Sequence, residues 1–290
     1  MSARRAAPLP PLLYESLLRA ALAEDLGTAG DLTTDAIVDP DATASAAIVA
    51  RSGGTAAGVG IATAGFHLLD PGVVVTCRAA DGDAVGPGTV LATVTGPARA
   101  ILTAERVVLN LLGRLCGIAT ATARFVAAVG DHPARIVPTR KTTPGLRVLE
   151  RSAVRAGGGA DHRFGLADGV LIKDNHIAVA GSITEAVGRV RRRVGHMVFV
   201  EVEVDTVAQL DEAVASTIDA VLLDNMTTDE LAEAVARTPD GIVTEASGGV
   251  TLESVPQIAA TGVHLISVGW LTHSAPALDV GLDVTASASA

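Results

Sequence analysis

The first third of the chain alternates helical spacing with short apolar runs. Helices are predicted over residues 12–24, 58–69 and 103–129, and strands over residues 44–50 and 73–77. From Asp81 to Leu102, Gly and Asp turns separate short β-branched runs, a pattern typical of antiparallel hairpins. Gly30–Asp35 reads as a polar turn in which Asp31 or Thr33 could cap a helix. These features predict a small α/β domain.

After residue 129, short apolar strands alternate with amphipathic helical stretches. The predicted strands are 170–172, 198–204, 220–223, 242–244 and 263–268, and the helices between them are 183–194, 207–216, 229–237 and 252–260. Repeated β-α units of this length predict a parallel sheet, and their number favours a barrel over an open sheet. A doubly wound open sheet stays an alternative, but no GxGxxG follows an early strand, so dinucleotide binding has little support.

Polar residues recur at the carboxyl ends of these strands. They are Lys173, Glu201, Glu203, Asp224, Glu245, Ser247 and, as a backbone turn, Gly269. The carboxyl ends form the mouth of a β/α barrel, where chemistry is placed. Glu203 lies nearer the mouth than Glu201, which we expect to sit deeper and brace a basic residue. A single polar residue at a strand end is more often explained by its exposure to solvent than by function. Five successive strands that end in this way weaken that explanation.

The acidic chain, with a formal net charge of -10, concentrates basic residues in one segment. Residues 135–173 hold eight Arg or Lys against three acidic residues, and both of the chain's lysines, Lys141 and Lys173, lie here. A mixture of planar guanidinium and compact ammonium groups suits a multiply charged small anion. A solvated helix face explains Arg147, Arg151 and Arg155 equally well. It does not explain the remaining basic residues, which Thr, Pro and Gly surround.

Two glycine turns follow the last predicted strands. Ser247, Gly248 and Gly249 precede a helix expected near Thr251, and Val268-Gly269 precedes another turn. Backbone N–H groups at such turns bind phosphate, and the last two loops of a barrel are a common phosphate site.

Composition narrows the protein class. An acidic chain that has 2% aromatic residues and no basic, aromatic-laced surface is not expected to bind nucleic acid. Prolines interrupt the N-terminal apolar residues and no run approaches membrane-spanning length, so we expect neither a signal peptide nor a membrane span. Cys77 and Cys116 show no metal spacing or disulfide framework, which makes a reducing cytoplasm the expected location.

Several motifs, in order, resemble those of the quinolinate phosphoribosyltransferase family. They are GDLTT, AERVVLNLLGRLCGIAT, TRKTTPGLR, GGGADHRFGL, VLIKDNHI, EVEVDT, LLDNM, EASGGVTLE and SVGWLTHSAPALD. The resemblance covers roughly residues 12–283. It implies an N-terminal open α/β sandwich followed by an incomplete, seven-stranded α/β barrel. The expected domains are 1–115, with 275–290 packed back on it, and 116–274, which carries the active site.

The resemblance also implies a reaction and a site. The family converts quinolinate and phosphoribosyl pyrophosphate, with Mg²⁺, into nicotinate mononucleotide, pyrophosphate and carbon dioxide. It works as a homodimer in which an arginine, here Arg106, reaches the neighbouring subunit's site. The implied residues fall into three groups: Thr139, Arg140, Lys141, His162, Arg163 and Lys173 for quinolinate and pyrophosphate; Glu203 and Asp224 for ribose and Mg²⁺; and Ser247, Gly248, Gly249, Val268, Gly269 and Trp270 for the 5′-phosphate.

Two positions depart from the family pattern. Pro138 stands where the family usually has an acidic residue, and Trp270 stands where it usually has a small one. Neither removes a basic group, but Trp270 could narrow the site or pack outside it. The alternatives are a same-fold enzyme with another acceptor, such as nicotinate phosphoribosyltransferase or the molybdenum-associated homologue, and a non-catalytic sensor of phosphoribosyl compounds.

Overall fold

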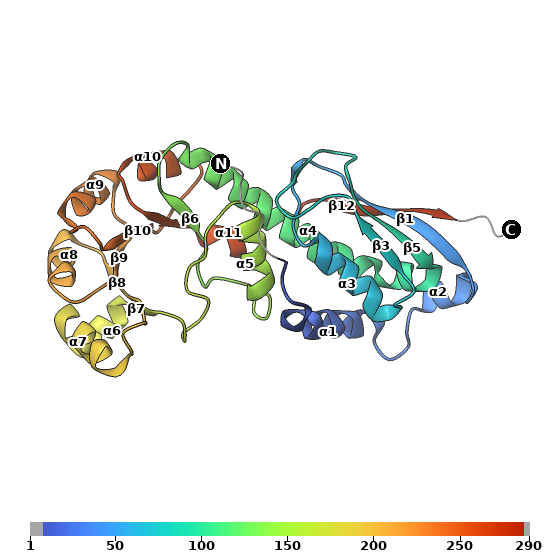
Figure 1. The fold of residues 1–290 in the computed structure, drawn as a ribbon, viewed down its shortest axis with the longest axis horizontal. Coiled ribbons are helices and arrows are strands. Elements are labelled where there is room, and N and C mark those ends of the chain that lie inside the picture. The colour runs from blue at the N-terminus through green and yellow to red at the C-terminus, as the bar shows by residue number, and fades with distance from the viewer. Residues whose placement is uncertain (1–7, 287–290) are drawn as a thin grey trace. The chain divides into compact units, whose positions relative to one another are not determined.

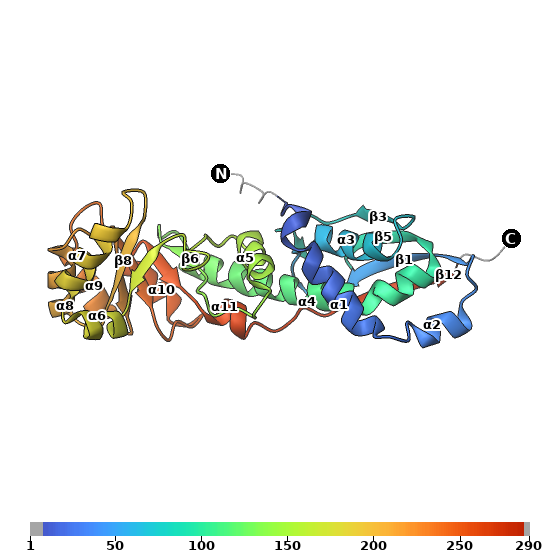
Figure 2. The same cartoon turned by 90° about the horizontal axis from the view of Figure 1, so that it is seen from below.

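The computed structural model describes residues 8–286 of the chain (Figures 1 and 2). The chain forms two compact units. The first unit contains residues 1–123, 142–158 and 271–290, and the second contains residues 124–141 and 159–270. The expected division at residue 115 differs from these units, because residues 142–158 belong with the first.

The first unit is built on a four-stranded antiparallel sheet with the order β12-β1-β5-β3. Its strands are β1 (Thr43–Ala50), β3 (Val74–Cys77), β5 (Val90–Pro97) and β12 (Val280–Ala286), and β2 (Gly54–Thr55) pairs separately with β4 (Ala84–Val85). The expected hairpin region therefore supplies β5, which lies between β1 and β3. Strand β12 pairs with β1 from Ala50↔Val280 to Ala44↔Ala286, so the described C-terminal residues belong to this sheet. Residues 287–290 lie outside the described part.

The helices of the first unit pack on this sheet and on one another. They are η1 (Pro11–Leu13), α1 (Glu15–Leu26), α2 (Leu32–Ile37), α3 (Val59–Leu69), α5 (Arg147–Ala156), α11 (Trp270–His273) and most of α4 (Ala98–Val129). Ile48, Phe66, Leu91 and Ile101 are fully buried in one apolar cluster. A second cluster joins α1, α4 and α5, which explains why α5 belongs to this unit.

Helix α4 begins at Ala98, five residues before the expected start at Thr103, and runs to Val129. By length and composition it could cross a membrane, contrary to the expectation that no run approaches that length. However, 61% of its most apolar window is buried inside the structure, as in the core helix of a globular protein.

The second unit is built on a six-stranded parallel sheet with the order β6-β11-β10-β9-β8-β7. Its strands are β6 (Arg135–Val137), β7 (Val170–Ile172), β8 (Val200–Val204), β9 (Ala220–Asp224), β10 (Val243–Ser247) and β11 (Leu265–Ser267). Its complete helices are α6 (Asp174–Ala180), α7 (Ile183–Arg193), α8 (Val207–Val214), α9 (Thr228–Arg237) and α10 (Val255–Ala260), and they lie outside the curved sheet (Figure 1). The sequence predicted neither β6 nor α6, which are only three and seven residues long.

The barrel has six regular strands rather than seven, and an irregular segment takes the seventh position. The end strands β6 and β7 do not pair with each other. The Ala160 N–H donates to the Ile136 carbonyl of β6 at 2.8 Å. Three residues later, the Arg163 guanidinium donates to the Gly169 carbonyl, just before β7, at 3.2 Å. Residues 160–163 therefore bridge the open side, so the fold is the expected incomplete α/β barrel.

Candidate active site

A cavity of about 430 Å³ lies at the carboxyl ends of the parallel strands in the second unit. Its lining side chains come from nearly every strand end: Pro138, Thr139, Arg140 and Lys141 after β6; His162 and Arg163 from the irregular segment; Leu171 and Lys173 at β7; and Glu203, Leu222, Asp224, Glu245, Ser247 and Ser267 from β8 to β11. Five of these side chains are basic. Their convergence makes the cavity suitable for a small molecule that carries several negative charges.

The cavity brings together most of the residues that the sequence predicted. Thr139, Arg140, Lys141, His162, Arg163, Lys173, Glu203, Asp224 and Ser247 line it. Gly248, Gly249, Val268, Gly269 and Trp270 follow β10 and β11 without lining the cavity, and Arg106 belongs to the first unit.

Lys173 and Glu203 pair with each other at the mouth. Ile172 of β7 is in register with Val202 of β8, so the next residue of each strand lies beside the other. The Lys173 Nζ donates to Glu203 Oε2 and forms an ion pair. Glu203 is mostly covered, whereas the Lys173 side chain is 45% exposed. Lys173 can therefore turn towards an anionic ligand while Glu203 stays at the cavity wall.

Arg163 lies among other cations. Its pKa is lowered, first by burial and then by the positive charge of Arg140. Repulsion between buried guanidinium groups is relieved when an anion binds between them. The charge of the cavity, and not only its shape, therefore favours an anionic ligand.

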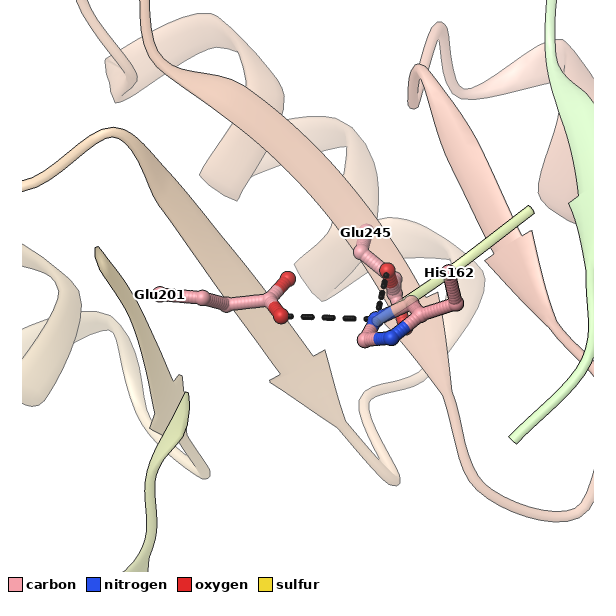
Figure 3. Close-up of side chains that lie close together, drawn as sticks. All are labelled: His162, Glu201 and Glu245. Carbon is pink, nitrogen blue, oxygen red and sulfur yellow. Dashed lines mark ion pairs between the residues drawn. The ribbon is translucent and has the colours of Figure 1, made fainter. Parts of the chain in front are cut away.

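His162 lies between two buried carboxylates (Figure 3). Its Nε2 is 3.1 Å from Glu245 Oε2 and 3.4 Å from Glu201 Oε2. Glu201 is 5% and Glu245 1% exposed, so neither carboxylate has much water around it. The sequence-based expectation that Glu201 lies deeper than Glu203 and braces a basic residue is confirmed, and that residue is His162.

This His162 cluster, defined as His162, Glu201 and Glu245, retains an extra proton at neutral pH. Burial alone would lower the pKa of His162, but the hydrogen bonds and charges of Glu201 and Glu245 outweigh burial and raise it to about 10. Burial, with the charge of Glu245, raises the pKa of Glu201 despite the opposing effect of His162. The Arg163 N–H donates to His162 Nδ1 at 2.8 Å, so that nitrogen accepts and the ring proton sits on Nε2. The three groups therefore share one proton more than a neutral histidine and two carboxylates would carry, which leaves the cluster with a net charge of -1.

The donor atoms of the His162 cluster lie within 4.8 Å of one another, close enough to hold a metal ion. An imidazole is a poor ligand for Mg²⁺, which prefers oxygen ligands. The carboxylates of Glu203 and Asp224 both line the cavity and match that preference.

The loops after β9 and β10 pack closely against each other at a glycine. Gly248 has φ +94°, and a Cβ there would lie 2.1 Å from Asn225 Oδ1. The Asn225 N–H in turn donates to the Ser247 carbonyl at 2.9 Å. Only glycine fits at position 248. The helix expected near Thr251 begins at Val255 instead, so the loop glycines do not directly open a helix.

Trp270 packs outside the cavity, which answers the question that the sequence raised. Its ring lies 6.3 Å from that of Phe125, tilted by 44°. Pro138, the other departure from the family pattern, lines the cavity itself.

The interpretation of Arg147, Arg151 and Arg155 as a solvated helix face is wrong for Arg151. Arg151 is 3% exposed and the neighbouring Glu150 is fully buried. Helix α5 is buried from Leu149 to Val154 and so has no continuous solvent face there.

Arg106 lies in the first unit beside the GDLTT turn. It lines a small pocket with Asp31 and Thr103, and its own side chain is 65% exposed. Asp31 accepts from the Thr34 N–H at 2.9 Å as the cap of α2 and from Thr103 Oγ1 at 3.0 Å. The turn is therefore fixed to α4 one helical turn before Arg106.

Sequence reasoning left five of the cavity's residues without a site role. Leu171, Leu222 and Ser267 belong to strands, Glu245 was noted only as a polar strand end, and Pro138 only as a departure from the family pattern. Ser267 could have been found because it stands at the carboxyl end of its strand, just before the Val268-Gly269 turn.

Comparisons with known proteins match nearly the whole chain. The family models for the N-terminal and C-terminal domains of quinolinate phosphoribosyl transferase match residues 31–116 and 118–283. A Bacillus subtilis protein named probable nicotinate-nucleotide pyrophosphorylase (carboxylating) is 51% identical over 276 residues, 95% of each chain.

Solved structures show the same fold. NadC from Streptococcus pyogenes superposes with a TM-score of 0.93 at 37% identity over 97% of this chain and 99% of that one. Nicotinate-nucleotide pyrophosphorylase from Ehrlichia chaffeensis gives 0.90 at 39% identity over 94% and 98%. The chain belongs to the quinolinate phosphoribosyltransferase family.

Proposed function

We propose that this chain is a nicotinate-nucleotide pyrophosphorylase (carboxylating), a pentosyltransferase. It transfers the phosphoribosyl group of phosphoribosyl pyrophosphate to the pyridine nitrogen of quinolinate and removes the 2-carboxylate. The products are nicotinate mononucleotide, pyrophosphate and carbon dioxide. This reaction supplies de novo NAD biosynthesis, which we place in the cytoplasm.

One observation carries the proposal. Five basic side chains from separate segments meet Glu203 and Asp224 in one cavity of about 430 Å³. Two adjacent carboxylates on a pyridine ring repel each other and need several cations to be held together. We assign Arg140, His162, Arg163 and Lys173 to these carboxylates. Lys141 takes a place between quinolinate and the pyrophosphate.

The chain has to position the reactants more than activate them. The pyridine nitrogen carries its own lone pair, so no side-chain nucleophile is required. The barrier lies in separating pyrophosphate from the ribose C1, which leaves positive charge on the sugar. Lys141 stabilises the departing pyrophosphate, and Glu203 with Asp224 orients the ribose hydroxyls. Once the ring nitrogen is quaternised, it stabilises the electron pair that carbon dioxide leaves on C2, which then takes up a proton.

Mg²⁺ is the proposed cofactor. The carboxylates of Glu203 and Asp224 at the ends of β8 and β9 suit it chemically, since Mg²⁺ typically uses one or two carboxylates together with substrate phosphates. When bound, Mg²⁺ would neutralise charge on the leaving pyrophosphate.

The remaining assignments concern the 5′-phosphate and the neighbouring subunit. Ser247, Gly248 and Gly249, and the Val268–Trp270 turn, follow the last two strands, where barrels commonly bind phosphate. Arg106 is mostly exposed in the first unit, and its ion pair with Glu105 is long, at 3.9 Å. We propose that the protein is a homodimer in which each Arg106 completes the partner's quinolinate site.

The direct test is to incubate the purified protein with quinolinate, phosphoribosyl pyrophosphate and Mg²⁺ and to measure nicotinate mononucleotide, pyrophosphate and carbon dioxide. The proposal predicts all three products in equal amounts. Tight binding of both substrates without turnover would instead support a sensor of phosphoribosyl compounds.

A further inference from the structure

A buried ion pair in the first unit joins four chain segments at one point. Arg114 of α4 donates through Nε to Glu150 Oε1 of α5 at 2.8 Å, and its Nη2 donates to the same oxygen. Glu150 is fully buried, and Arg114 is 29% exposed.

The same guanidinium also holds the loop at Thr143 and helix α11 at Thr272. Its Nη2 donates to Thr143 Oγ1 at 2.8 Å and to the Thr272 carbonyl at 2.8 Å. Glu150 uses its second oxygen to accept the Thr143 N–H at 3.2 Å. Thr143 is therefore held through both its backbone and its side chain.

Both segments follow strands, β6 and β11, whose carboxyl ends border the candidate active site. Thr143 stands two residues after Lys141, and Thr272 stands two residues after Trp270. Lys141 and Trp270 are also the last residues of the second unit before the chain returns to the first. The Arg114–Glu150 pair thus fixes the ends of the segment that carries Arg140 and Lys141 and of the segment that carries Gly269.

We propose that Arg114 and Glu150 are positioning residues for the phosphoribosyl pyrophosphate part of the site. By binding Thr143 and Thr272 together, they set the spacing between the pyrophosphate-binding Lys141 and the 5′-phosphate turn at Gly269. This inference rests on the proposed function, which assigns both segments to one substrate. A misplacement of about 1 Å at such contacts can cost on the order of a hundredfold in rate.

Arg114 suits this role better than lysine could. A planar guanidinium reaches the carboxylate, the Thr143 hydroxyl and the Thr272 carbonyl at once, whereas a lysine ammonium is one flexible point charge. Arg114→Lys keeps the buried charge compensated but loosens the loops. Thr143→Val leaves the Arg114–Glu150 pair intact and removes only the hydroxyl acceptor.

The test compares these two variants with Arg99→Lys, a matched change on the same helix. Arg99 pairs with Asp35 at 3.1 Å and donates through Nε to the Val38 carbonyl at 2.8 Å, but contacts neither loop. We expect the KM for phosphoribosyl pyrophosphate to rise about tenfold in Arg114→Lys and less in Thr143→Val, with the KM for quinolinate changed less than twofold. The KM for phosphoribosyl pyrophosphate of the double variant should be little higher than that of Arg114→Lys, because both changes release the same loop.

The Tm of each variant separates positioning from stability. If Arg114→Lys and Arg99→Lys lower the Tm alike and change the KM for phosphoribosyl pyrophosphate alike, the inference is overturned. A wild-type protein that turns over no quinolinate would overturn the proposed function instead. In that case, binding of phosphoribosyl pyrophosphate, followed by Trp270 fluorescence, still tests the role of the Arg114–Glu150 pair. Weaker binding by Arg114→Lys but not by Arg99→Lys would support the inference. Equal binding by the two variants would refute it.

Discussion

Lys173 and Glu203 form an ion pair across the carboxyl ends of β7 and β8. Two residues that we assign to different substrates are thus bound to each other. We expect a quinolinate carboxylate to compete with Glu203 for the Lys173 ammonium. This exchange would give a cation to quinolinate and a carboxylate to ribose or Mg²⁺.

Lys173→Met tests this exchange. A hydrogen bond to a charged group contributes about 1.5–3 kcal/mol, so the KM for quinolinate should rise about ten- to a hundredfold while the KM for phosphoribosyl pyrophosphate changes little. Arg192→Met on the exposed face of α7, whose side chain is 68% exposed, is the control. Steady-state kinetics with each substrate varied in turn will measure both constants. Equal effects of the two substitutions would refute the assignment of Lys173.

The His162 cluster predicts how stability depends on pH. The pKa of His162 is raised from 6.5 to about 10, and that of Glu201 is also raised, so the folded cluster binds more protons than the unfolded chain. Its contribution is complete below pH 6.5 and is lost as pH rises through about 10. The free energy of unfolding should fall by at most about 1.4 kcal/mol per pH unit in this window.

Urea unfolding without Mg²⁺ between about pH 6.5 and 8.5 will measure this slope. The range stops there because burial also raises the pKa of Tyr14, and that of Cys116 to about 12, which adds a slope of the same sign at higher pH. Glu201→Gln should flatten the slope, since it removes one of the two carboxylates that raise the pKa of His162. A wild-type protein with no slope in this range would contradict the cluster's extra proton.

Trp270→Phe should leave catalysis nearly unchanged. The indole packs on Phe125 rather than in the cavity, and any contact of this turn with the 5′-phosphate is through the backbone. We expect a loss of unfolding free energy of about 1 kcal/mol from the smaller aromatic contact, and a KM for phosphoribosyl pyrophosphate within twofold of wild type. A tenfold rise in that KM at unchanged Tm would place the ring in the site after all.

Subunit complementation tests the role of Arg106. Arg106→Ala and Lys141→Ala should each be inactive alone. When the two variants are coexpressed, half of the dimers are mixed and each mixed dimer contains one intact site. Activity should therefore return to about a quarter of wild type. No recovery, despite mixed dimers detected by differently tagged subunits, would show that Arg106 serves its own chain.

The alternation of strands and helices made the barrel predictable. Helices α7, α8 and α9 begin at or within one residue of their expected starts, because Ser182, Thr206 and Thr227 cap them. The order of the two glutamates along β8, on one face of the strand, also placed Glu201 deeper than the cavity-lining Glu203. These features depend on local spacing, which a sequence records directly.

Long-range pairing was not predictable. Strand β12 exists because it pairs with β1, more than 200 residues away, and β6 is three residues long and begins with Arg135. Helix α10 begins late because Thr251 and Ser254 hydrogen-bond to each other's backbone N–H and hold a turn. The burial of Arg151 depends on how α5 packs against α1 and α4, which helical spacing does not reveal.

The central claim is that the basic cavity recognises two adjacent carboxylates. The most direct test compares kcat/KM for quinolinate and for nicotinate, each with saturating phosphoribosyl pyrophosphate and Mg²⁺. Nicotinate lacks one of the two carboxylates and so leaves buried cations unpaired. The kcat/KM for quinolinate should therefore be at least a thousandfold higher, a difference on the order of 4 kcal/mol. A preference for nicotinate would contradict the account and leave a phosphoribosyltransferase whose basic side chains serve another purpose.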